Sequence, residues 1–163
     1  MKKLLLIGLI ACVGYSQEKD CELNLDRKDE LTGKVEKETF LKELDFKFSD
    51  DVYGKLSVKI TRYGSQKYLV FYSDTNLGCI SPHKDDLSKV YIKLENDDIL
   101  TFNHCGLLDC GDTYLKGRLL ESEIIRLKKS PIKYIKIIGT QYYEEIWCDK
   151  NKDYFIKNLD CIN

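Results

Sequence analysis

The stretch KLSVKITRYGSQKYLVFYS, residues 55–73, contains the pattern that decides the fold class. Apolar side chains recur at every second position from Leu56 to Ile60, with polar side chains between them. This period of two is typical of a β-strand with one buried face. The sequence therefore predicts a strand over 55–63, a Gly-Ser-Gln turn and a second strand over 67–73, which together form a hairpin.

Shorter strand patterns follow, and two helices are expected in the C-terminal third. Val90, Ile92 and Leu94 form the apolar face of one strand, which a Glu-Asn-Asp-Asp loop joins to the next. A serine cap, early acid, late lysines and a following proline predict a helix within 122–131, and a second helix is expected over 150–161. Further strands are expected at 89–94, 99–105, 114–120, 132–139 and 141–147. The predicted fold class is α+β: a mostly antiparallel β-sheet of about seven strands with a short helix and a C-terminal amphipathic helix.

The first sixteen residues predict export. Two lysines precede an apolar run from Leu4 to Val13, which is too short to span a bilayer and is typical of a secretory signal peptide. Small residues at the two positions that a signal peptidase reads predict cleavage after Ser16, leaving a single domain over 17–163. The expected location is periplasmic or extracellular. An alternative is a lipobox ending at Cys12, whose lipidation would give an outer-membrane lipoprotein.

Charge is nearly balanced in the expected domain. Residues 17–163 carry 24 basic and 27 acidic side chains, a net charge of −3. The N-terminal segment 17–38 is the most polar part and is expected to be loosely held. Because basic and acidic residues are interleaved, no nucleic-acid partner is expected. The one lysine cluster is expected to be a solvated face and consists of Lys128, Lys129, Lys133 and Lys136.

Removal of residues 1–16 leaves six cysteines, and an even number in an exported chain predicts a disulfide framework. Cys105 and Cys110 flank a short loop containing glycine and are expected to form a staple. A helix over 150–161 would place Cys148 and Cys161 ~20 Å apart, too far for a disulfide. Cys161 is therefore expected to pair with Cys21 or with a partner in the neighbourhood of Cys148, but not with Cys148 itself. The candidates are Cys21, Cys79, Cys105, Cys110, Cys148 and Cys161.

The stretch NHCGLLDCGD, residues 103–112, also has an alternative interpretation. His104, Cys105 and Cys110 are residue types that bind zinc, and the two cysteines could exchange thiols. A structural zinc site usually needs a second close pair of ligands, and a redox site usually has a C-x-x-C motif; the sequence has neither. A metal- or thiol-dependent enzyme centred on these three residues is therefore the alternative to the staple.

No other stretch of the sequence provides a coherent catalytic or cofactor site. Ser81 and His83 share a loop, but no nucleophile elbow or glycine-rich oxyanion loop accompanies them. Residues 149–160 match several positions of a calcium loop, but Tyr154 stands where the sharp turn needs glycine. Phosphate-loop and dinucleotide fingerprints are not found, so no cofactor is expected.

Aromatic residues gather near the strand expected at 141–147. Alternation places Tyr143 and Trp147 on one face of this strand and Tyr142 on the other. The simplest interpretation is that these rings fill one side of a thin core. Exposed tyrosine and tryptophan favour binding interfaces, so Tyr143 and Trp147 become candidate residues for a protein or glycan ligand if they are exposed.

Three segments carry a family resemblance: DELTGK (29–34), ENDDILTF (95–102) and SPIKYIKIIGT (130–140). With the short signal ending in Ser-Gln, they resemble a group of small exported domains from Bacteroidota. The resemblance implies an exported β-rich domain without an assigned activity, so it brings no catalytic residues. The first hypothesis is a non-enzymatic exported domain that acts by binding or as a cell-envelope component. Membrane contact is expected only if the chain is lipidated.

Overall fold

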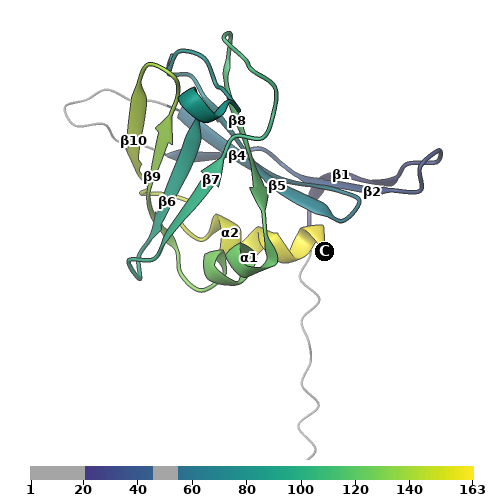
Figure 1. The fold of residues 1–163 in the computed structure, drawn as a ribbon. Coiled ribbons are helices and arrows are strands. Elements are labelled where there is room, and N and C mark those ends of the chain that lie inside the picture. The colour runs from purple at the N-terminus through teal and green to yellow at the C-terminus, as the bar shows by residue number, and fades with distance from the viewer. Residues whose placement is uncertain (1–20, 46–54) are drawn as a thin grey trace, which may run out of the picture.

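The computed structural model describes residues 21–45 and 55–163, which form two antiparallel β-sheets around one core (Figure 1). The predicted signal peptide and Cys12 lie outside the described residues. The larger sheet has the order β1-β2-β4-β5-β8, with β3 paired to β4. Its strands are β1 (Leu23–Lys28), β2 (Val35–Thr39), β3 (Lys42–Asp45), β4 (Lys55–Tyr63), β5 (Gln66–Ser73) and β8 (Thr113–Leu119). The smaller sheet has the order β10-β9-β6-β7 and consists of β6 (Lys89–Leu94), β7 (Ile99–Asn103), β9 (Ile132–Ile138) and β10 (Tyr143–Trp147).

The β4–β5 hairpin is the centre of the larger sheet, and its prediction is confirmed. Tyr63 pairs with Gln66 across a two-residue loop, and Gly64 takes the positive φ that such tight loops need. Leu56, Val58 and Ile60 are fully buried, as their alternation predicted. The inner face of this hairpin therefore forms one wall of the core.

The second wall of the core is the inner face of the smaller sheet, and the two sheets meet where β7 ends beside β8. His104, just after β7, forms an isolated bridge with Gly117 of β8. A side chain at Gly117 would meet the Cβ of Phe102 at 2.6 Å, so this close approach requires glycine. The core side chains of the smaller sheet include Val90, Ile92, Leu100, Phe102, Ile135, Ile137 and Ile146.

Both helices lie together at one end of the two sheets (Figure 1). They are α1 (Glu121–Leu127) and α2 (Tyr154–Asn158), and a 3-10 turn, η2 (Leu159–Ile162), continues from α2. The terminal helix is shorter than the predicted 150–161, because the carbonyl of Lys152 accepts a hydrogen bond from Ile132 beside β9. Another 3-10 turn, η1 (Lys84–Asp86), precedes β6.

The prediction of about seven strands is wrong, since the described residues contain ten. The three additional strands are β1, β2 and β3, which lie in and directly after the polar N-terminal segment. The β1–β2 hairpin projects from the body of the molecule (Figure 1), with an ion pair of 2.6 Å between Arg27 and Glu36 across it. Because many of its side chains face solvent, the hydrophobic pattern that marks a strand in sequence is missing here.

Two disulfides are present among the described cysteines. Cys21 is bonded to Cys161, which agrees with the prediction for Cys161. Cys110 is bonded to Cys79, so the predicted Cys105–Cys110 staple is wrong. The backbone explains this partner choice: residues 80 and 109, next to the two cysteines, form an isolated β-bridge. The two bonds indicate an oxidising, exported compartment.

Candidate functional site

The histidine that the sequence singled out, His104, has a structural role. His104 is only 3% exposed, and both of its ring nitrogens have backbone partners. The backbone N–H of Lys116 donates to Nδ1 at 3.1 Å, and Nε2 lies 3.0 Å from the carbonyl oxygen of Leu107. Because Nδ1 accepts a hydrogen bond, the proton belongs on Nε2, which donates it to Leu107. Neither nitrogen is left to bind a metal ion or to take a proton from a substrate.

The two cysteines of this stretch cannot act as a pair. Cys110 is bonded to Cys79, and Cys105 is a free, exposed thiol whose sulfur lies 3.2 Å from the carbonyl oxygen of Lys116. Burial raises the pKa of Cys105, although the charges of Lys116 and Arg118 oppose that shift. The geometry therefore gives no support to a metal or thiol centre built on His104, Cys105 and Cys110.

The other candidate residues for a catalytic or calcium site are also occupied by hydrogen bonds within the protein. The hydroxyl of Ser81 donates to Asp86 at 2.6 Å and accepts a hydrogen bond from the backbone N–H of His83, so no Ser-His pair forms. Asn151, in the calcium-like segment, donates to the carbonyl of Glu43 at 2.9 Å. Within residues 21–45 and 55–163, no group of three or more metal-ligating side chains could hold an ion.

The aromatic residues behave differently, because their expected place in the core is wrong. Tyr143 is 63% exposed and Trp147 is 54% exposed, although both lie on β10 within the smaller sheet. Their strand neighbours Glu144 and Ile146 point inward and are buried. The prediction that Tyr143 and Trp147 share one face of the strand is therefore correct. The prediction that this face lies in the core is wrong, because it faces outward.

Register places further aromatic and basic side chains beside Tyr143 and Trp147. Trp147 pairs with Tyr134 of β9, and Lys136 of β9 pairs with Tyr91 of β6. We call this outer face of the smaller sheet the aromatic platform. It comprises Lys89, Tyr91, Tyr134, Lys136, Tyr143 and Trp147.

Contacts among these side chains hold the rings against the sheet. The ring centroids of Tyr134 and Trp147 are 5.3 Å apart with an angle of 39° between the planes. The ammonium of Lys136 lies 3.9 Å from the ring centroid of Tyr143 and pairs with Glu145 at 2.7 Å. The hydrogen bond to Glu145 raises the pKa of Lys136, so this lysine stays charged. The platform is therefore a set of supported rings rather than loose side chains.

The outer face of the smaller sheet carries three lysines, Lys89, Lys93 and Lys136, and one carboxylate, Glu145 of β10. Lys89 lies over the ring of Tyr91 and has no carboxylate within 4 Å among the described residues. Lys93, at the other end of β6, pairs with Asp97 at 2.9 Å, and this hydrogen bond raises the pKa of Lys93. The strand alternation that puts Val90, Ile92 and Leu94 on the apolar face leaves Lys89, Tyr91 and Lys93 on the opposite face. What the sequence did not reveal was the order of the strands, which brings Tyr91 and Tyr134 into one surface with Trp147.

Comparison with protein-family models, curated proteins and solved structures finds no match to this chain. The resemblance to exported Bacteroidota domains therefore stays a prediction. Neither helix in the described ranges has the length and apolar composition needed to cross a membrane.

Proposed function

We propose that this chain is an exported, non-enzymatic binding domain whose aromatic platform holds a polysaccharide chain. The observation that carries the proposal is the exposure of Tyr143 and Trp147 on a regular strand of a well-packed sheet. Water contact with such large rings is unfavourable, and tyrosine and tryptophan in this position are typical of binding surfaces. Export through the signal peptide 1–16, or anchoring at Cys12, belongs to the same proposal.

The composition of the platform favours a glycan over a protein partner. Protein interfaces have a desolvated apolar centre, whereas here the lysines lie among the rings. The aliphatic side chains on this face, Ile99 and Ile138, belong to opposite ends of the sheet and form no such centre. A sugar ring presents an apolar C–H face that can cover an aromatic ring and a rim of hydroxyls that can reach charged side chains.

The dimensions of the platform favour a chain over a single sugar. Tyr143 and Trp147 are four residues apart on one strand, which corresponds to about 13 Å at the usual rise. Tyr134 stacks beside Trp147, so that end of the platform offers two rings. A ligand that uses both ends must therefore be longer than one sugar ring.

Trp147 is the only tryptophan in the chain, so its fluorescence reports on the platform alone. We expect soluble β-glucan, xylan or chitin oligosaccharides to shift the emission to shorter wavelength and to protect it from acrylamide. The Tyr143→Ala variant should bind about five- to tenfold more weakly, because one aromatic contact is lost.

Tyr142→Ala is the matched control, since Tyr142 is 62% exposed but lies just outside β10. It should bind like the wild-type protein. Unchanged emission with every oligosaccharide, or an equal loss in both tyrosine variants, would contradict the proposed function.

A further inference from the structure

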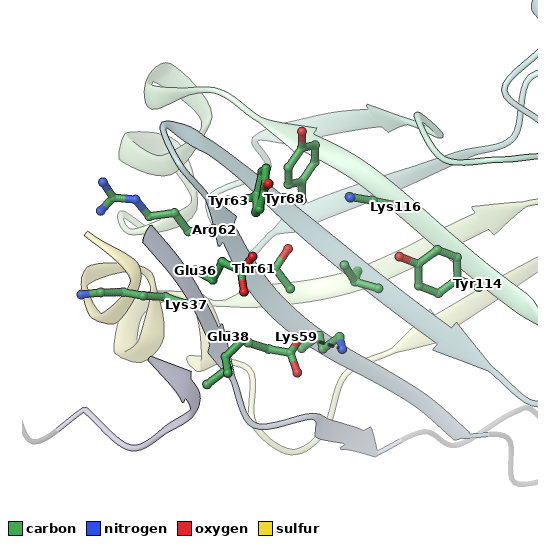
Figure 2. A pocket seen from close by; sticks show the side chains of 12 residues that line it. Glu36, Lys37, Glu38, Lys59, Thr61, Arg62, Tyr63, Tyr68, Tyr114 and Lys116 are labelled. Carbon is green, nitrogen blue, oxygen red and sulfur yellow. Dashed lines mark ion pairs between the residues drawn. The ribbon is translucent and has the colours of Figure 1, made fainter. Parts of the chain in front are cut away.

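The larger sheet carries a separate recess on its outer face, away from the aromatic platform. It has a volume of about 250 Å³ and lies over β2, β4, β5 and β8 (Figure 2). We call it the tyrosine groove. The residues on which its chemistry depends are Glu36, Glu38, Lys59, Tyr68, Tyr114 and Lys116.

Val70 forms the floor of the tyrosine groove. It points outward from β5, between Lys59 of β4 and Lys116 of β8, yet it is only 1% exposed. It is not part of the core between the two sheets. The groove side chains therefore close over an apolar floor of their own, which is a feature of a formed site rather than of a flat sheet surface.

One side of the groove is basic and has no internal neutralising partner. The ammonium of Lys116 lies 4.1 Å from the ring centroid of Tyr68, and no carboxylate lies within 4 Å of it among the described residues. Figure 2 shows Lys116 between Tyr68 and Tyr114. Burial raises the pKa of Tyr114, so its hydroxyl stays protonated and can donate a hydrogen bond. This side therefore offers a cation and a neutral donor.

The other side of the groove is acidic and already engaged. Glu38 pairs with Lys59 at 2.9 Å, and Glu36 pairs with Arg27 at 2.6 Å. Partial burial is the largest single effect and lowers the pKa of Lys59, but its interactions with Glu38 and Tyr72 together outweigh burial, so the pKa of Lys59 is raised. Carboxylate oxygens on this side can accept further hydrogen bonds from hydroxyl groups of a ligand.

We infer that the tyrosine groove binds an acidic saccharide, with a uronic-acid carboxylate at Lys116 and Tyr114 and sugar hydroxyls toward Glu36 and Glu38. The two sides of the groove select this ligand. A single carboxylate matches the ammonium of Lys116, and several hydroxyl groups match the carboxylates of Glu36 and Glu38. The sugar ring can cover the tyrosine rings. The groove and the platform lie on different sheets, so binding at one does not require binding at the other.

The test is calorimetric titration of the purified protein at low salt with tetragalacturonate, and with its methyl ester as the uncharged control. We expect the acid to bind and the ester to bind at least tenfold more weakly, because the charge-assisted contact is lost. Added salt should weaken only the binding of the acid. Lys116→Gln should reduce affinity for the acid at least tenfold, and Tyr114→Phe about threefold or more.

Lys84→Gln is the matched control, because Lys84 is an exposed lysine of η1 outside the groove. It should bind the acid like the wild-type protein, and far-UV circular dichroism verifies that each variant is folded. Three results would overturn the groove as the site: no binding by the wild-type protein, equal binding of acid and ester, or a loss in Trp147→Ala instead of Lys116→Gln. The first two leave the proposed function of the platform untouched, since that is read from neutral oligosaccharides.

Discussion

The two free thiols of the described chain differ in how deeply they are buried. Cys148 is 2% exposed, and burial raises its pKa to about 12. Cys105 is exposed, with a pKa that burial raises and that Lys116 and Arg118 partly restore. Because the thiolate is the reactive form, these two residues should differ in their rates of alkylation.

We therefore predict that iodoacetamide modifies Cys105 in the native protein at pH 8 and leaves Cys148 unmodified until the protein is denatured. Peptide mapping by mass spectrometry would locate the adducts. Native modification of Cys148 at the rate of Cys105, or alkylation of Cys79 or Cys110, would contradict the arrangement described here.

Single residues could be predicted from sequence only where local patterns decide their environment. The opposite faces of Tyr143 and Glu144 follow from strand alternation alone. The bond between Cys79 and Cys110 does not, because it depends on a loop contact between segments 31 residues apart. Cys105 is closer to Cys110 in the sequence than Cys79 is, and the prediction relied on that distance. The pairing instead follows the contact between the two loops.

At the scale of elements, His104 joins the end of β7 to β8 and to the loop at Leu107. Burial lowers the pKa of His104, with the Leu107 hydrogen bond opposing the shift. The folded state therefore favours the neutral ring. Below the unfolded pKa of about 6.5 the unfolded chain binds more protons, so stability falls as pH falls through this region.

We predict that the free energy of unfolding decreases between pH 7.5 and pH 5.5, and that the decrease is smaller in a His104→Gln variant. Urea titrations at each pH would measure it. The variant should also be less stable at pH 7.5 by about 1–3 kcal/mol, because the buried backbone N–H of Lys116 loses its acceptor. An equal pH dependence in both proteins would show that His104 does not titrate as described.

Strands with one fully apolar face could be predicted closely, and β6 has the expected bounds of 89–94. The strands β1 and β2 could not, because charged and polar side chains cover most of their surface. Their pairing depends on neighbours that are distant in sequence: β2 binds the far end of β4, where Glu38 pairs with Thr61. The platform was missed for the same reason, since the order β10-β9-β6-β7 is not encoded in any one segment.

The whole molecule presents two outward faces of different chemistry on a shared core. The aromatic platform covers the smaller sheet, and the tyrosine groove lies on the larger one. The inner faces of both sheets are apolar and packed, so binding at either outer face needs no rearrangement of the core. If the platform and the groove bind the ligands proposed above, one domain can hold two glycans at the same time.

One disulfide joins the two ends of the described chain. The Cys21–Cys161 disulfide joins the start of the projecting hairpin to η2 over a sequence separation of 140 residues, against 31 for Cys79–Cys110. A disulfide restricts the unfolded chain more when it closes a longer loop, which corresponds to about 5 kcal/mol for the first bond and about 4 kcal/mol for the second. The stability of the molecule should therefore depend more on the bond between its ends.

We predict that the Cys21→Ala/Cys161→Ala protein loses about 1 kcal/mol more stability than the Cys79→Ala/Cys110→Ala protein, as measured by urea unfolding at pH 7.5. The second protein is the matched control, because it also lacks one disulfide and two sulfur atoms. In the first protein, β1 has no covalent link to the end of the chain. Hydrogen bonds from β2 remain: the Lys37 ammonium donates to the carbonyl oxygen of Asn163 at 2.8 Å, and the hydroxyls of Thr39 and Tyr154 lie 2.7 Å apart. A greater loss in the Cys79/Cys110 variant would mean that the local loop, rather than the closure of the chain, governs the stability of the fold.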